Sequence, residues 1–249
     1  MSPAAAKAGE KARLDQIASD SWYSKGLNTC TIDYCAEVFA RFFQGRRCLE
    51  MGPAEGVMTR HLARAFPGLT LVEGAEAFSD SLRARFPSAV VVHSLFEDFK
   101  PSDRFDTIVL GHVLEHVENP VEILRRAGSW LTPGGVICCA VPNAWSLHRQ
   151  AAVILGMLDS EESLNVADLH HGHRRVYNPE SLRADFLASG LSIRHFGGYW
   201  IKALSNAQME GTWTPEMIRA FMQLGERYPD IAAEIYVIAS MEPGSSPGA

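Results

Sequence analysis

Apolar and polar positions alternate along this chain in a way that is typical of an α/β protein. From Arg46 onward, short apolar runs such as TIVL and VICCAV are separated by stretches in which apolar residues recur at helical spacing. This alternation predicts right-handed βαβ crossovers and a parallel sheet covered by helices on both faces. Because the runs are apolar throughout, we expect buried parallel strands rather than a half-exposed antiparallel sheet.

The segments before and after this region have a different pattern. Residues 30–43 carry apolar side chains at helical spacing, which predicts an amphipathic helix. The first dozen residues and the tail from Glu242 to Ala249 have the composition of disordered ends. We therefore expect an N-terminal tail that can act as a lid (residues 1–28), one domain (29–241) and a flexible tail (242–249).

The regular rhythm breaks after Pro142 and resumes at Asn178-Pro179, where Asn can cap a helix and Pro can take its first position. Residues 143–178 therefore form an insertion after the fifth predicted strand, and long insertions usually cover a site. Two further apolar runs, LSIRHFGGYW and AAEIYVIASM, flank a helical stretch at 214–227. We expect these two runs to pair at one edge of the sheet.

The composition narrows the class of protein. A chain of 249 residues with 47% hydrophobic residues can bury a sizeable core, and its formal net charge of -6 gives no general attraction to nucleic acid. Five cysteines without a CxxC pair favour reduced thiols over disulfides or a zinc site. No segment has the length of a membrane span or the apolar stretch of a signal peptide. We expect a cytoplasmic protein that does not bind a membrane.

The strongest chemical signal is the run LEMGPAEG, in which Glu50 lies inside a predicted strand and Gly52, Ala54 and Gly56 form a turn before a helix expected near Val57. Glycines in such a turn let a ligand approach the backbone. A dinucleotide-binding turn requires GxGxxG, and this turn reads ExGxAxG instead. The pattern therefore disfavours an NAD-dependent oxidoreductase.

Two further signals follow the next predicted strands. Glu73 ends the run TLVE, where a carboxylate can accept both hydroxyls of a ribose, although an acid in a turn can also be merely exposed. The glycine turn upstream of Glu73 favours ribose binding. Leu95 and Phe96 follow the third strand and can enclose a purine ring, or can be ordinary packing residues.

Together with FDTIVLGHVLEHVENP and LTPGGVICCAVPN, these motifs resemble the class I S-adenosylmethionine-dependent methyltransferases, and among them the ubiquinone-biosynthesis-like small-molecule enzymes. The four motifs occur in that family's order over about Ala36 to Val141; Ala54 stands where many members have a second glycine. The resemblance implies a Rossmann-like, seven-stranded α/β sheet of order 3-2-1-4-5-7-6 flanked by helices, with S-adenosylmethionine (SAM) as cofactor and S-adenosylhomocysteine (SAH) as product. The cofactor residues that it implies are Glu50, Gly52, Gly56, Glu73, Leu95, Phe96, Gly111 and His112.

Methyl transfer from a sulfonium is an in-line displacement, and a hydroxyl acceptor also needs a proton acceptor. His112 would touch both ligands, and the insertion places three histidines in the run DLHHGHRR at 168–175. One or more of these side chains can act on the acceptor, or they can brace the loop. We expect no metal, because adjacent histidines rarely face one ion. The catalytic candidates are His112, His171 and His173, and the substrate-binding candidates are Tyr23, Asn143, Trp145, His170 and Arg174.

Other residues and functions remain as alternatives. Trp22, like Tyr23, can close the site, and His116 is expected early in the helix after the fourth strand, where we interpret it as structural. The sequence predicts N- or O-methylation of a small molecule in natural-product tailoring, by a monomer or homodimer that binds no nucleic acid. The alternatives are a methyltransferase for protein or RNA and a noncatalytic SAM-binding protein.

Overall fold

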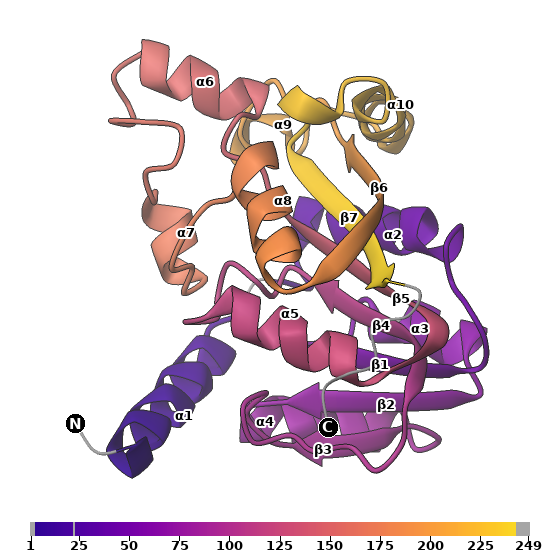
Figure 1. The fold of residues 1–249 in the computed structure, drawn as a ribbon. Coiled ribbons are helices and arrows are strands. Elements are labelled where there is room, and N and C mark those ends of the chain that lie inside the picture. The colour runs from indigo at the N-terminus through magenta and orange to yellow at the C-terminus, as the bar shows by residue number, and fades with distance from the viewer. Residues whose placement is uncertain (1–2, 22, 243–249) are drawn as a thin grey trace. The chain divides into compact units, whose positions relative to one another are not determined.

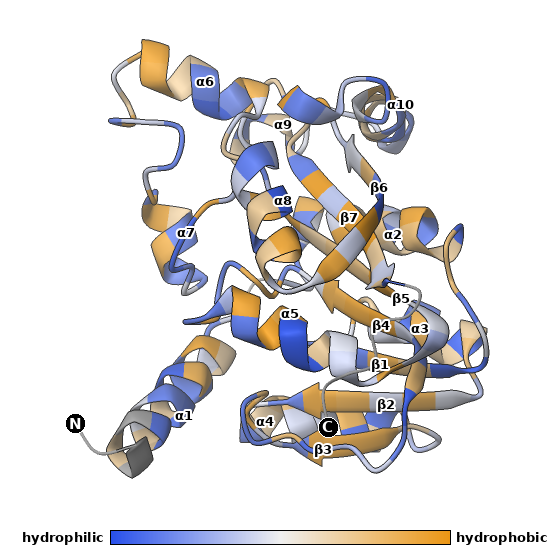
Figure 2. Ribbon diagram, in the orientation of Figure 1, coloured by the Kyte–Doolittle hydropathy of each residue, from blue (hydrophilic) through white to orange (hydrophobic). Residues whose placement is uncertain are grey.

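A computed structural model describes residues 3–21 and 23–242 of the chain (Figure 1). The chain divides into two compact units: residues 1–111 with 130–135, and residues 112–129 with 136–249. The hydrogen-bonded strand order is β3-β2-β1-β4-β5-β7-β6, which confirms the predicted seven-stranded order. Apolar residues run along the strands of both units (Figure 2).

The first unit is built on parallel strands, as the apolar runs predict. These are β1 (Arg47–Met51), β2 (Gly68–Glu73), β3 (Val90–His93) and β4 (Phe105–Gly111). β1 pairs in parallel with β2 and β4, and β2 pairs in parallel with β3. Because neighbouring parallel strands end at the same edge, the residues that follow β1, β2 and β3 are brought to one side of the unit.

Within the described residues, the helices of the first unit are α1 (Pro3–Ser19), α2 (Gly26–Ala40), α3 (Thr59–Ala65) and α4 (Glu76–Arg85). α2 begins at Gly26, earlier than the hydrophobic pattern indicates, and α3 begins two residues after Val57. α4 packs against β2 and β3. The predicted helices are therefore present, with shifted ends.

The expectation that the first dozen residues lack structure is wrong, because α1 starts at Pro3. Its Ala, Lys and Glu residues are strong helix formers, so the same composition that suggests disorder also favours a helix. Two polar contacts hold α1 in the unit: Lys7 pairs with Asp98, and the Asp15 carboxylate accepts the Glu76 backbone N–H at 3.2 Å. Trp22 lies outside the described residues.

The second unit holds the antiparallel strands. β7 (Glu234–Met241) pairs antiparallel with residues 137–142 of β5 (Leu131–Pro142) on one side and with β6 (Leu191–Tyr199) on the other. Residues 131–135 of β5 belong to the first unit. The two apolar runs near the C-terminal end therefore do pair, as predicted. The helices of this unit are α5 (Pro120–Ser129), α6 (Leu147–Ile154), α7 (Val166–His170), α8 (Pro179–Ala188), α9 (Asn206–Met209), α10 (Pro215–Gly225) and the 3₁₀ turn η1 (Pro229–Ile231).

The insertion is organised by local caps and by one buried arginine. Asn178 caps α8 in a capping box with Pro179 at the first helical turn, as the sequence predicts. Arg149 is buried, and it donates to the carbonyls of Glu161 and Ser163 and to the Asp168 carboxylate. These contacts close the segment between α6 and α7 into an ordered loop.

Residues 243–249 of the predicted flexible tail lie outside the described part of the chain. Within the described residues, no helix combines the length and the apolar character that a bilayer crossing requires.

Candidate active site

The glycine turn after β1 has backbone conformations that glycine adopts most easily. Gly52 and Gly56 have φ values of 67° and 73°, and Ala54 between them has a φ of 46°. A Cβ at Gly56 would lie 3.0 Å from side-chain carbons of Leu82 and Phe86. Gly56 is therefore required both by its conformation and by packing. Ala54 carries left-handed strain that a second glycine would not.

Glu73, at the end of β2, joins this turn to the start of α4. Its two carboxylate oxygens accept the backbone N–H of Ala54 at 3.0 Å and of Ala75 at 2.9 Å, and the residue is buried. Burial raises the pKa of Glu73, and the backbone hydrogen bonds only partly offset that rise. The lone pairs that these bonds leave can accept ribose hydroxyls.

Glu50, near the end of β1, is a second buried carboxyl in the first unit. Only 2% of Glu50 is exposed, and one of its oxygens accepts the Thr59 hydroxyl at 2.7 Å. Burial raises the pKa of Glu50 to about 8, with the charge of Glu73 adding to the rise and the Thr59 hydrogen bond opposing it. A cationic ligand at this point would favour the ionised carboxylate.

The residues after β2 and β3 provide an apolar environment. Leu95 is buried and Phe96 is partly exposed. A Cβ on Gly74 would lie 2.5 Å from Leu14 of α1 and 3.5 Å from Leu95, so α1 packs closely over the end of β2. The His93 ring nitrogen lies 3.0 Å from the Gly74 carbonyl oxygen. This combination of apolar side chains and backbone polar groups suits a purine.

A cavity of about 360 Å³ opens beside the glycine turn. Of the predicted cofactor residues only Gly56 lines it, so the cavity lining does not include Glu73. Tyr23 does not line it either, although its neighbour Ser24 does. The lining residues are Ser24, Thr29, Glu55, Gly56, Val57, Arg60, Phe78, Ser81 and Arg85.

In the second unit, His112 lies between two buried carboxyl groups. Its Nδ1 is 3.7 Å from an oxygen of Glu115 and 3.7 Å from an oxygen of Glu234, while its Nε2 is buried and makes no hydrogen bond with the described residues. The backbone of His112 has a φ of 58°, and its N–H donates to the Ala140 carbonyl. A left-handed, non-glycine residue with a buried, unpaired ring nitrogen is typical of a functional position.

The charges in this group stabilise one another. Burial alone would lower the pKa of His112, but its contact with Glu115 and the charge of Glu234 raise the pKa above its usual value. Burial would raise the pKa of Glu115, and the contact with His112 brings it below its usual value. The pKa of Glu234 remains raised by burial. His112 and Glu115 thus favour each other's charged forms, whereas burial disfavours ionisation of Glu234.

The histidines of the insertion are held by a carboxylate. Asp168 lies 3.2 Å from His173 Nδ1 and accepts a hydrogen bond from Arg149 at 3.0 Å. Burial would raise the pKa of Asp168, but His173, the Asn165 N–H and Arg149 lower it to about 2. Burial and the charges of His173 and His170 lower the pKa of His171 to about 4. His171 is therefore neutral at neutral pH and a weak proton acceptor.

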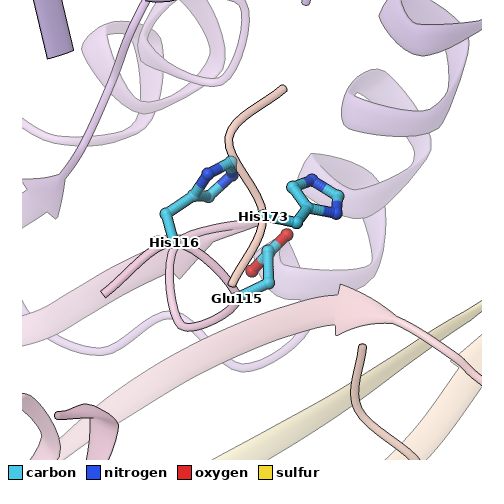
Figure 3. Close-up of side chains that lie close together, drawn as sticks. All are labelled: Glu115, His116 and His173. Carbon is cyan, nitrogen blue, oxygen red and sulfur yellow. The ribbon is translucent and has the colours of Figure 1, made fainter. Parts of the chain in front are cut away.

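Three side chains come close enough to hold a divalent cation (Figure 3). Glu115, His116 and His173 each offer one ligand atom, and these atoms lie within 4.8 Å of one another. The sequence predicts no metal site, because adjacent histidines rarely face one ion. It also predicts that His116 lies inside a helix. That expectation is wrong: α5 begins only at Pro120, so His116 lies in the turn before the helix. Its ring meets the His173 ring edge to face at 4.7 Å.

The other predicted substrate residues have varied environments. The Asn143 amide is engaged by the backbone, since it donates to the Asp230 and Ala232 carbonyls and accepts the Trp145 N–H. Arg174 is exposed and donates to the His116 carbonyl. His170 and Trp145 are partly exposed, and Tyr23 lies in the first unit.

Comparisons with known proteins agree on one family. A family model described as "Methyltransferase domain" matches residues 27–195, more than half of the chain. The chain belongs to the class I SAM-dependent methyltransferase family. SAM is accordingly its cofactor, as the sequence predicts.

The relatives of this methyltransferase include ubiquinone biosynthesis O-methyltransferases. The protein of Caulobacter sp. (strain K31) is 28% identical over 71% of this chain and 78% of its own length, and that of Aeromonas salmonicida is 24% identical over 79% and 87%. Among solved structures, the CcbJ methyltransferase of Streptomyces caelestis has a TM-score of 0.63 at 15% identity, covering 92% of this chain and 98% of its own. The N-methyltransferase NodS of Bradyrhizobium japonicum, in complex with SAH, has a TM-score of 0.60 at 12% identity, covering 95% and 99%. The solved structures support the fold.

Sequence reasoning missed part of the methyltransferase's polar group. Glu115 and His116 lie within the run GHVLEHVENP, so the sequence already shows that they are close to His112 along the chain. Glu234 carries no such signal, because it stands at the start of an apolar run and reaches His112 only through the strand order. Arg149 is likewise missed, because its burial depends on carbonyls of a loop without a sequence pattern.

Proposed function

We propose that this methyltransferase transfers the methyl group of SAM to a hydroxyl oxygen of a small molecule, as a tailoring step in natural-product metabolism. The observation that carries the proposal is the buried His112 ring, with two carboxyl groups at Nδ1 and an unpaired Nε2. A hydroxyl must lose its proton during methylation, whereas a neutral amine needs less help. The names of the ubiquinone biosynthesis O-methyltransferases support an oxygen acceptor.

The first unit supplies the cofactor contacts in this proposal. Glu73 accepts the ribose hydroxyls, Leu95 and Phe96 enclose the adenine, and Glu50 with the glycine turn lines the methionine part. These roles follow the family pattern and fit the two buried carboxyl groups described above. Gly111 stands beside His112 in the chain, where the family pattern places the sulfonium.

The second unit supplies the groups for the acceptor. His112 accepts the hydroxyl proton, and His173 with the neighbouring insertion residues contacts the acceptor. His171, with its low pKa, serves as a contact rather than as the base. A net charge of -6 argues against RNA as the substrate. Methylation of a protein, and SAM binding without catalysis, are the competing outcomes.

Cofactor binding is tested by calorimetry with SAM, SAH and NAD. We expect SAM and SAH to bind and NAD not to bind. A His112→Asn variant keeps a residue that tolerates a left-handed backbone, so its fold should persist. It should retain SAM affinity within about threefold and lose turnover by about 100-fold or more. Full turnover of this variant would refute the assignment of His112 as the base.

The acceptor class is tested with SAM that carries a tritiated methyl group. The enzyme is incubated separately with the low-molecular-mass, protein and RNA fractions of a bacterial extract. We expect label in the low-molecular-mass fraction and, after hydrolysis, in O-methyl rather than N-methyl groups. Label confined to protein or RNA, or to N-methyl groups, would contradict the proposal.

A further inference from the structure

Glu115 is a buried carboxyl that the described residues leave without a hydrogen bond. Its exposed fraction is 0%, and neither of its two oxygens has a hydrogen-bond partner among these residues. The His112 ring nitrogen lies 3.7 Å from one of them, which is beyond hydrogen-bond length. Burying a carboxyl without such bonds is costly. A further partner for these oxygens is therefore expected.

Two histidines lie beside this carboxyl (Figure 3). Glu115, His116 and His173 each offer one ligand atom, and these three atoms lie within 4.8 Å of one another. An ion that binds four ligands at about 2.1 Å holds them about 3.3 Å apart. The atoms therefore need to approach by at most about 1.5 Å to share one ion of this kind. All three residues belong to the second unit.

Asp168 orients one of the two rings. One of its oxygens lies 3.2 Å from His173 Nδ1, and the other accepts a hydrogen bond from buried Arg149 at 3.0 Å. Because Nδ1 is turned toward this carboxylate, Nε2 is the His173 nitrogen that is left for an ion. Histidines that bind metal ions commonly have a carboxylate at their second nitrogen, which fixes the ring and makes it more basic.

Two consecutive arginines join the segments that carry the ligands. Arg174 donates its backbone N–H to the Glu115 carbonyl at 2.8 Å and its side-chain Nε to the His116 carbonyl at 2.9 Å. Arg175 donates to the carbonyls of Leu114, Val117 and Glu118. The turn between β4 and α5 is thus tied to the end of the insertion, where His173 lies.

The kinds of ligand indicate which ions fit. Imidazole suits ions such as Zn²⁺, whereas Mg²⁺ and Ca²⁺ prefer oxygen ligands. Two histidines and one carboxylate leave a fourth position of Zn²⁺ open, as in zinc enzymes that bind a water molecule or a substrate there. The sequence-based argument against a metal concerned adjacent histidines. His116 and His173 come from different segments, so that argument does not apply to them.

We propose that Glu115, His116 and His173 bind one Zn²⁺ ion and leave one of its coordination positions open for an oxygen ligand. The site stands on the geometry of these side chains. Its use in catalysis rests on the proposed function, in which the open position takes the hydroxyl oxygen of the acceptor. His173 then acts on the acceptor through the ion. A hydroxyl bound to Zn²⁺ loses its proton more easily.

The ion adds a ligand bond and leaves the balance of the transfer unchanged. The acceptor O–H bond breaks, and the proton goes to the base of the proposed function. The oxygen forms a bond to the methyl carbon while the bond between that carbon and sulfur breaks. The electron pair stays on sulfur and gives neutral SAH. Zn²⁺ is neither oxidised nor reduced.

Calorimetry with Zn²⁺ alone tests the site. The full chain, prepared without a histidine tag, is treated with EDTA, dialysed and titrated with Zn²⁺. We expect one ion per chain and binding of Mg²⁺ at least about 100-fold weaker. His116→Ala and His173→Ala should each weaken Zn²⁺ binding by about 100-fold or more, and Glu115→Gln by about tenfold or more, since even the loss of a residue behind a ligand costs 10- to 100-fold.

Two matched controls remove zinc-binding side chains outside the group. Cys30 is an exposed free thiol, and His195 is an exposed histidine on β6. Cys30→Ser and His195→Ala should leave the Zn²⁺ affinity within about threefold of the wild type. Melting curves establish that each variant is folded. His116 is only partly buried, so His116→Ala should fold even if a change at buried Glu115 does not.

X-ray absorption at the zinc edge identifies the ligands directly. The loaded wild type should show two imidazole nitrogens and oxygen ligands at about 2.0–2.2 Å, and loaded His116→Ala should show one imidazole. No Zn²⁺ binding by the wild type would overturn the site. So would unchanged affinity in folded His116→Ala and His173→Ala, or a loss of affinity in either control.

The outcomes separate the site from the proposed function. Zn²⁺ held by the expected ligands, without methyl transfer to any hydroxyl, would refute only the proposed function. Methylation of a hydroxyl by a chain that binds no Zn²⁺ would overturn the metal site and leave the proposed function intact. With an active acceptor, EDTA should lower kcat by about tenfold or more, and added Zn²⁺ should restore it.

Discussion

SAM binding should make Glu50 release a proton. The Glu50 carboxyl is buried at the end of β1, and burial raises its pKa from 4.5 to about 8. Below pH 8 the empty site therefore holds Glu50 mainly in its neutral form. SAM carries a sulfonium and an ammonium group, and positive charge beside a carboxyl favours ionisation. The pKa of Glu50 should fall when the cofactor binds.

The size of the effect follows from the pKa. A rise from 4.5 to about 8 corresponds to about 5 kcal/mol for ionising Glu50 in the empty site. If SAM returns the pKa to 4.5, the free protein holds one more proton than the complex between pH 4.5 and 8. The dissociation constant should then fall about tenfold for each pH unit in this window and level off above pH 8.

The same linkage applies to folding. A rise in pH strengthens SAM binding, but it should lower the stability of the SAM-free protein. The folded state holds the Glu50 proton more tightly than the unfolded chain does, so this group favours folding at low pH. Its contribution to the free energy of unfolding should decline as the pH rises from 4.5 through 8. Saturating SAM should remove that decline, because the complex keeps Glu50 ionised.

Calorimetry in buffers of different ionisation enthalpy counts the protons. We expect nearly one proton released on SAM binding at pH 6.5 and almost none above pH 9. Glu50→Gln should abolish the release. Thr59→Val removes the hydroxyl that lowers the Glu50 pKa, so release should persist to higher pH. No release at pH 6.5, or equal release from Glu50→Gln, would refute this reasoning.

Three further changes have defined outcomes. Glu73→Ala should weaken SAM binding by about 10²- to 10⁴-fold in calorimetry, because charge-assisted hydrogen bonds are lost. Glu76→Ala, which changes an exposed residue, should have little effect. Similar SAM affinities of the two variants would argue against ribose binding by Glu73. Ala54→Gly should raise the free energy of unfolding by about 0.5–1 kcal/mol in urea titrations, and a loss of stability would contradict the left-handed strain. Asp168→Asn should lower the free energy of unfolding by about 3–5 kcal/mol, because buried Arg149 loses its charged partner. An unchanged urea midpoint would show that the ion pair is dispensable.

The sequence predicts the first unit in most of its features. Parallel strands have nearly continuous apolar runs, and ligands of such sheets gather at the carboxyl ends of the strands, so Glu50 and Glu73 can be picked out as candidates near the ends of such runs. The strand order itself comes from the family resemblance. The backbone of Ala54 cannot be read in the same way, because a small residue in a turn does not reveal its φ.

The group around His112 is predicted only in part. His112 and His173 follow from motif position and from the histidine-rich run, but Glu234 does not. Its neighbours in the sequence are those of a core strand, and only pairing of β7 with both β5 and β6 brings it to His112. Asn143 shows the converse: a polar residue just after a strand is a reasonable ligand candidate, yet its amide is used to hold the turn before β7.

The packing of α1 has a kinetic consequence. Leu14 covers Gly74 next to Glu73, Lys7 pairs with Asp98, and the Asp15 carboxylate accepts a hydrogen bond from Glu76 at the start of α4. If adenosine binds at this edge, we expect the exchange of SAH for SAM to wait for these contacts to open. Turnover under saturating acceptor would then report on the release of α1. A purification tag fused at the N-terminus would change the measured rate without touching a residue that binds either ligand.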